Sequence, residues 1–135
     1  MRIGKYISAV LNADAAVGAI VGDRIYPVFI PANGIFPCVV YMVNNAPHDQ
    51  AKDHAGNLDR AVVTFHLWAE YSERQQAYSV LEDLDAAIRT AFDFVEGTSG
   101  GVQVEICHYD GSVDGRDENN MAYLKTATYT FIHQK

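Results

Sequence analysis

The first dozen residues carry apolar side chains at the spacing of one helical face. These side chains are Ile3, Ile7, Val10 and Leu11. Because positions i, i+4, i+7 and i+8 lie on the same side of an α-helix, residues 2–12 predict a short amphipathic helix. Asp14 is placed to cap a second helical stretch over residues 15–21, and Gly22 predicts where that stretch ends.

Extended segments follow these helices. Residues 24–27 predict a brief extended piece, whose Pro27 favours an edge or a strand end. Residues 36–43 form a continuous apolar run that is too short for a typical core helix. We therefore expect a strand buried on both faces, with Pro37 at its start. From residue 44 to residue 59 the periodicity is lost, which predicts a long loop or a partly open hairpin.

Later segments alternate between apolar and polar residues, as half-buried strands do. In residues 61–71 one face carries Val63, Phe65, Leu67 and Ala69, and the other carries Val62, Thr64, His66, Trp68 and Glu70. Further along, Val102, Val104 and Ile106 alternate with Gln103, Glu105 and Cys107. Residues 122–132 predict the last strand. The acidic turn at residues 110–120 indicates an antiparallel hairpin with an extended tip.

A long helix is predicted between these strands. Ser72, with Gln75 three residues later, fits a capping box at its start. Its apolar face is Ala77, Val80, Leu81, Leu84, Ile88, Ala91 and Phe92. On the solvent side we expect Asp85 to pair with Arg89, and the glycine-rich residues 97–101 to end the helix.

Strands grouped on either side of one well-capped helix define an α+β fold class. We expect an antiparallel or mixed β-sheet, with the long helix and the N-terminal helix packed on one face, and not a doubly wound parallel sheet. A chain of 135 residues is the size of one domain, so residues 1–135 are predicted to form a single domain.

The charge balance narrows the choice of partner. Ten Lys and Arg residues against seventeen Asp and Glu residues leave a net charge of −7, which disfavours binding to a phosphate backbone. Cys38 and Cys107 lie in apolar runs and are expected to be buried free thiols, which suit a reducing cytoplasm. No apolar run reaches the length of a membrane span, so we expect a soluble protein without a membrane partner.

One segment resembles a calcium-binding loop. Asp110, Ser112, Asp114 and Gly115 match its positions 1, 3, 5 and 6. Position 12 requires a bidentate Glu but is Met121, and the flanks are strand-like. A solvated turn is therefore the favoured interpretation. Weak cation binding by Asp110, Asp114 or Asp117 is the alternative.

Other groups of polar residues lack the spacing of a metal site or a catalytic site. His48, Asp49, Asp53 and His54 crowd one predicted loop without the spacing of a zinc site, so loop polarity explains them. His66 favours a surface or interface position over a catalytic one. No nucleophile elbow, Cys/His pair or phosphate-binding Gly-Lys loop occurs, so no catalytic residue, metal or cofactor is assigned.

Large aromatic residues that lie beside polar residues are typical of protein contact surfaces. Trp68, Tyr71 and Tyr78, together with the loop at residues 44–58, fit a protein interface as well as an ordinary half-exposed sheet face. The candidate interface residues are His48, Asp49, Asp53, His54, Trp68, Tyr71, Asp110, Asp114 and Asp117.

Several stretches together resemble one known family. They are Asn12-Ala13-Asp14-Ala15-Ala16-Val17, then Val21-Gly22-Asp23-Arg24-Ile25-Tyr26-Pro27 with the Pro-initiated apolar strand after it, then Trp68-Ala69-Glu70-Tyr71, and Gln75-Gln76-Ala77 in the following helix. In this order they are similar to the tail-completion, or tail-terminator, proteins of long-tailed bacteriophages and prophages. The likeness extends from about residue 3 to residue 131, and the Gly-Asp-Arg-Ile-Tyr-Pro segment is its most specific part.

The resemblance implies a structural role in virion assembly. A tail terminator forms a ring, usually a hexamer, on the head-proximal end of the tail tube. There it stops addition of the major tail tube protein and meets the head-tail connector. It implies location in the virion tail after assembly in the bacterial cytoplasm, with DNA only passing through the channel. Under this hypothesis Asp49, Asp53, Asp110, Asp114, Asp117 and Glu118 could line the channel. The alternatives are a head-closure or neck protein, a metal-dependent enzyme and a calcium-binding module.

Overall fold

The computed structural model describes residues 3–32, 34–45, 58–70, 74–117 and 122–134. Within these residues the chain forms three helices and six strands. The helices are α1 (Ile3–Ala13), α2 (Ala15–Val21) and α3 (Arg74–Phe92). The strands are β1 (Ile25–Pro27), β2 (Cys38–Asn45), β3 (Leu58–Glu70), β4 (Gly97–Ser99), β5 (Val102–Asp117) and β6 (Ala122–Gln134).

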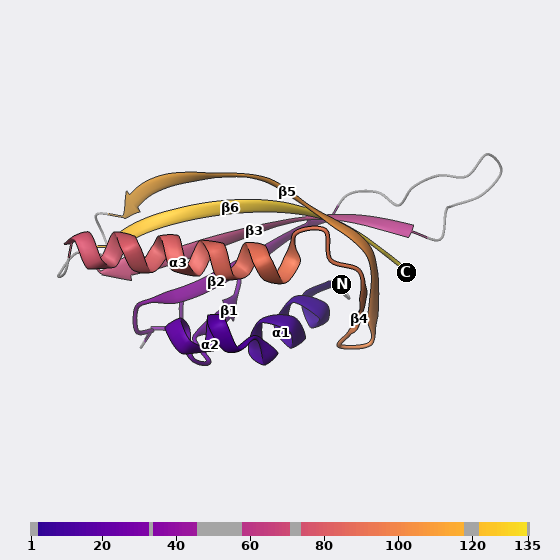
Figure 1. Ribbon diagram of the computed structural model, residues 1–135, viewed down its shortest axis with the longest axis horizontal. Coiled ribbons are helices and arrows are strands. Elements are labelled where there is room, and N and C mark those ends of the chain that lie inside the picture. The colour runs from indigo at the N-terminus through magenta and orange to yellow at the C-terminus, as the bar shows by residue number, and fades with distance from the viewer. Residues whose placement is uncertain (1–2, 33, 46–57, 71–73, 118–121, 135) are drawn as a thin grey trace.

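The strands make one mixed sheet. Among the described residues its order is β1-β2-β3-β6-β5-β4, so that β1 and β4 lie at opposite edges. β1 runs parallel to β2, and the other pairs are antiparallel. Figure 1 shows α1, α2 and α3 on the same side of the curled sheet. The expected α+β class, with helices on one face, is confirmed.

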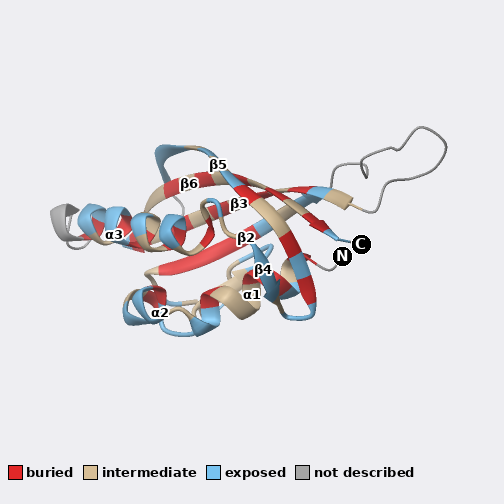
Figure 2. Cartoon of the chain, turned by 45° about the vertical axis from the view of Figure 1, so that its right-hand side comes forward, coloured by how far each residue is buried: buried red, intermediate tan, exposed pale blue. Residues whose placement is uncertain are grey.

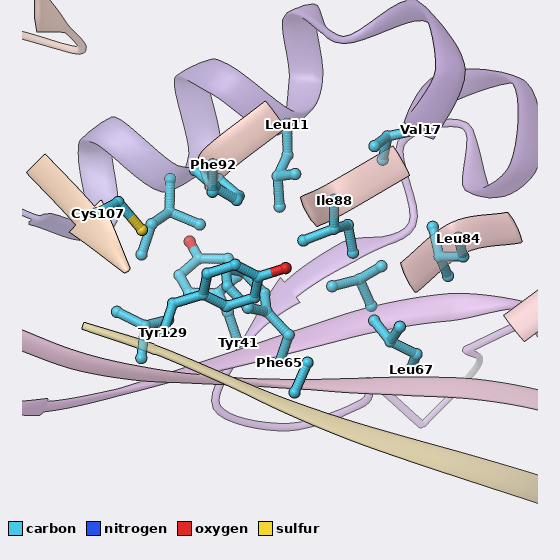
Figure 3. Close-up of a cluster of buried hydrophobic side chains, with 14 of the residues drawn as sticks. Leu11, Val17, Tyr41, Phe65, Leu67, Leu84, Ile88, Phe92, Cys107 and Tyr129 are labelled. Atoms are coloured by element: carbon cyan, nitrogen blue, oxygen red, sulfur yellow. The ribbon is translucent and has the colours of Figure 1, made fainter. Parts of the chain in front are cut away.

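The core lies between the sheet and its helices. β3 alternates as predicted, since Ala61, Val63, Phe65, Leu67 and Ala69 are buried toward the helices. From the other side α3 contributes Ala77, Leu81, Leu84, Ile88 and Phe92, as the helical spacing predicted. Figure 2 shows the buried positions in red on both layers, and Figure 3 shows how their side chains meet. Aromatic rings fill the centre, with Phe92 stacked on Phe65 at a centroid distance of 5.4 Å.

The N-terminal helices form as their sequence predicts. The Asp14 side chain accepts a hydrogen bond from the Val17 amide at 3.0 Å, which satisfies an amide of the first turn of α2. Gly22 ends α2 with a φ of 60°, a conformation that glycine adopts without steric cost. Ile3, Ile7 and Leu11 of α1 are fully buried.

The predicted end of the long helix is wrong. α3 ends at Phe92, and Gly97 begins the short strand β4 instead of stopping the helix. The chain leaves the helix through Phe94, whose φ is 59°, and its amide donates to the Cys107 carbonyl oxygen at 2.8 Å. A non-glycine residue with this backbone cannot be recognised from composition, because glycine is the usual residue there.

The predicted pair of Asp85 and Arg89 is also wrong. Arg89 pairs with Asp93 at 3.4 Å, four residues further along the helix. Asp85 is half-buried, and one of its carboxylate oxygens has no hydrogen-bond partner among the described residues. Burial raises the pKa of Asp85, because the charged form loses its contact with water.

β5 differs from its prediction in two ways. A register shift against β6 between Val104 and Ile106 turns Cys107 toward the core and leaves Ile106 half-buried, whereas the alternation had placed Ile106 with Val104. The strand also continues to Asp117, so the expected acidic turn at residues 110–117 is strand. Its antiparallel pairing with β6 is confirmed. Residues 118–121 lie outside the described residues.

Other predictions are confirmed in part. β2 starts at Cys38, just after Pro37, and is buried on both faces over residues 38–41, but Met42 is exposed. Of the loop expected at residues 44–59, residues 44–45 belong to β2 and residues 58–59 to β3. Residues 46–57 and the expected capping residue Ser72 lie outside the described residues. Cys38 and Cys107 are buried free thiols, and burial raises the pKa of Cys38 to about 12 and that of Cys107 further.

Candidate interaction surfaces

The sheet face that turns away from the helices, here called the outer face, is uncharged on its two central strands between Arg60 and Glu70 of β3. Its residues on β3 are Val62, Thr64, His66 and Trp68, and those on β6 are Leu124, Thr126, Thr128, Thr130 and Ile132. They pair across the strands, as Thr64 does with Thr128 and Trp68 with Leu124. A face of threonine and aliphatic side chains in a chain of net charge −7 suits contact with another protein.

A pocket opens at one end of the outer face. The segment after β1 crosses this face and covers Cys38 and Val40, which are buried although they pair with the outer residues Trp68 and His66. The half-open space measures about 480 Å³, which is the size of pockets that bind small ligands or single anchoring side chains. We call it the Trp68 pocket; its walls include Val28, Phe29, Phe36, Val40, His66 and Trp68.

Trp68 forms the base of this site. Its ring stacks on Phe36 with the centroids 6.3 Å apart and the planes at 16°. The indole Nε1 is buried and has no hydrogen-bond partner among the described residues. An unpaired buried donor carries a cost in the free energy of folding.

His66 is a neutral member of the same wall. Its Nδ1 lies 3.2 Å from the Thr126 Oγ1, and burial lowers the pKa of the imidazole. At neutral pH the ring therefore carries no charge, in keeping with its uncharged neighbours. The half-buried position agrees with the interface interpretation that the sequence favoured.

The aspartates of the calcium-like segment do not converge. Asp110 accepts a hydrogen bond at 2.5 Å from the hydroxyl of Thr130, on the outer face. Asp114 accepts from Lys125 Nζ and Tyr78 Oη, both at 2.7 Å, on the helix side. These two hydrogen bonds, that from Lys125 first, lower the pKa of Asp114. The carboxylates thus have separate partners, and the described residues contain no group of three or more His, Cys, Asp or Glu side chains that could hold a metal ion.

The remaining candidate residues are placed only in part. His48, Asp49, Asp53, His54 and Tyr71 lie outside the described residues. Asp117 is the last residue of β5. Trp68 is on the outer face, as expected, and Tyr78 is partly exposed on α3 beside Asp114.

The sequence interpretation missed the segment that builds the pocket. Val28, Phe29 and Ile35 are exposed in the connection between β1 and β2, where no periodic pattern marks them. A signal was present, because residues 25–45 contain no Asp, Glu, Lys or Arg. Edge strands ordinarily carry charges that discourage pairing with other chains, so an uncharged edge indicates a contact site.

None of the described helices is both long and apolar enough to span a membrane.

An uncharged sheet region with a pocket beside it is the kind of surface that structural subunits use to contact other proteins. The profile of the family "Tail completion protein gp17" matches residues 5–131, and the chain belongs to that family. It is a structural protein of virion tails and not an enzyme. As a component of an assembled virion particle, it has partners in the tail.

Solved structures share the fold. A chain from the "Virion of native gene transfer agent (GTA) particle" matches with a TM-score of 0.72 and 15% identity, over 97% of this chain and 92% of that chain. A second solved structure matches with a TM-score of 0.62 and 14% identity, over 100% of this chain and 97% of that chain. At these identities the likeness shows a common fold. No curated protein matches the chain.

Proposed function

We propose that this chain is a tail terminator: copies of it form a ring, usually a hexamer, that caps the head-proximal end of the tail tube. The observation that carries the proposal is membership of the tail completion family over residues 5–131. The uncharged part of the outer face between Arg60 and Glu70, together with the pocket, supports it, since a cap requires surfaces that bind the tube protein and neighbouring copies. The 135 residues act as one domain in the virion tail, after assembly in the host cytoplasm.

The mechanism is occlusion of a growing end. The ring covers the sites to which the next tube subunit would bind, and its opposite side meets the head-tail connector. No bond is made or broken, so the protein needs contact area and no reacting group. DNA passes through the channel without binding, because a chain of net charge −7 offers little attraction to phosphate. Among the acidic residues that could line the channel, Asp114 is paired with Lys125.

Removing the protein tests this proposal. Without a cap the tube continues to grow, so tails assembled in the absence of this chain are expected to be overlong and variable in length. The measurement is the length distribution by electron microscopy, with tails made in the presence of the wild-type chain as the control. Tails of normal length would reject the terminator role. Normal tails beside filled, tailless heads would indicate the alternative head-closure or neck role.

A further inference from the structure

Two exposed apolar residues have unusual backbone conformations. Among the described residues, Val28 and Phe94 are the non-glycine residues with positive φ, at 71° and 59°. Both are largely exposed, Val28 at 62% and Phe94 at 71%. This conformation is disfavoured for β-branched and bulky side chains, and residues held in it cluster at functional sites. A contact with another molecule would account for exposed apolar side chains at these two strained positions.

Val28 and Phe94 lie at opposite edges of the sheet. Val28 follows the edge strand β1 and lines the Trp68 pocket. Phe94 lies against β5 near the other edge, where its amide donates to the Cys107 carbonyl oxygen. The two sites also lie at opposite ends of α3, because Trp68 precedes this helix and Phe94 follows it. A helix of 19 residues is about 28 Å long, so Phe94 cannot fill the pocket of its own chain.

The two sites match in size and in aromatic character. Phe94 projects as a single aromatic ring, which touches the His108 ring edge to face at 6.0 Å. The Trp68 pocket is half-open, its walls carry the aromatic rings of Phe29, Phe36 and Trp68, and it is large enough for such a ring. Aromatic residues seated in desolvated pockets are the usual anchors of protein interfaces.

The surroundings of the pocket favour another copy of this chain as the occupant. The β1–β2 edge is uncharged over residues 25–45, which suits contact with a protein and not with a polyanion. A projection at one edge and a pocket at the other are what a heterologous, head-to-tail interface requires, and such interfaces close into rings when the rotation between neighbouring subunits closes. The exposed ring of Phe94, which has the size that the pocket accepts, is present on every copy of this chain.

We propose that Phe94 of one subunit inserts into the Trp68 pocket of the next copy, and that this contact forms the lateral interface of the ring. The proposal rests on the ring of the proposed function and adds which two edges meet. Each copy has one Phe94 and one Trp68 pocket. Every subunit in a closed ring therefore binds one neighbour through Phe94 and the other neighbour through its pocket.

Paired variants test the interface in the purified full-length chain. Phe94→Gly removes the projection and relieves the positive φ, so its melting temperature is expected to match or exceed that of the wild type. Ala32→Trp fills the pocket from its exposed rim. Each variant alone is expected to self-associate about 30-fold more weakly or worse, measured by sedimentation velocity over a concentration series.

Mixing the variants gives the decisive result. Phe94→Gly retains a pocket, and Ala32→Trp retains a projection, so an equimolar mixture is expected to form a heterodimer that grows no further. Glu82→Gln changes an exposed residue of α3 that lies outside the pocket walls and well before Phe94, and it is the control, with self-association unchanged. Wild-type-like association of either variant, or absence of the heterodimer while the wild type associates, would overturn the proposal.

A second measurement applies where the wild type remains monomeric in solution. A photoreactive phenylalanine analogue at position 94, in assembled particles, is expected to crosslink to residues 28–36 of another copy. Crosslinks only to other proteins, or to another segment of this chain, would refute the interface. Overlong tails in the absence of the chain would still support the terminator role, so failure of the interface and failure of the function are distinguishable.

Discussion

We expect Phe92→Ala to lower the free energy of unfolding by about 4 kcal/mol, because it deletes a fully buried aromatic ring from the centre of the core. Phe92 packs on Phe65 and Phe131 at centroid distances of 5.4 Å and on Tyr129 at 6.1 Å. These partners come from β3 and β6, so Phe92 joins α3 to the two central strands. The measurement is urea denaturation followed by circular dichroism.

Phe94→Ala provides the matched control, two residues further along. Since Phe94 is 71% exposed, its removal is expected to change the free energy of unfolding by less than about 0.5 kcal/mol. Equal losses for the two variants would contradict the placement of these side chains. Comparing the two variants thus distinguishes Phe92, which stabilises the folded chain, from Phe94, which is proposed to stabilise the contact between subunits.

Asp114→Ala is expected to cost about 1–2 kcal/mol at pH 7, because it leaves the Lys125 ammonium without its anion. Lys125 is only 8% exposed, which makes an unpaired charge there expensive. The carboxylate of Asp114 is half exposed, so solvent screening keeps the loss below that of a fully buried pair. Lys125→Met, which removes the charge and keeps the apolar stem, is expected to be nearly neutral.

The effect of Asp114 depends on pH in a defined direction. The hydrogen bonds from Lys125 and Tyr78 lower its pKa below the ordinary value of 3.8. Its stabilising contribution is therefore present above pH 3.8 and is lost as the pH falls through the lowered pKa. The difference between wild type and Asp114→Ala should shrink in acid. Asp110→Ala, at an exposed aspartate bonded to Thr130, is the control, and an equal loss there would contradict this explanation.

The parts of the fold that follow from local periodicity were predictable. β3 shows alternation with a period of two from Arg60 to Glu70, and α3 shows a buried face with a helical period. Both patterns arise because side chains alternate between the two faces of a strand and return to the same face of a helix about every 3.6 residues. Burial of one face therefore repeats along the sequence with that period. The exchange of Ile106 and Cys107 was not predictable, since a register shift depends on pairing with β6, which is distant in sequence.

The candidate surfaces were predictable only where aromatic residues fell on a regular strand. Trp68 was recognised because alternation placed it opposite the core. The pocket around it depends on how the connection after β1 crosses the sheet, and no local pattern encodes that path. Phe94 was missed for a similar reason, because its exposure follows from a helix that ends without glycine.

Imaging of assembled particles at a resolution that traces individual chains tests the central claim most directly. We predict a closed ring of copies of this chain at the head-proximal end of the tail tube, with the β1 edge of each subunit against the β5 side of the next. Copies distributed along the tube, located at its far tip, or present singly would contradict the account.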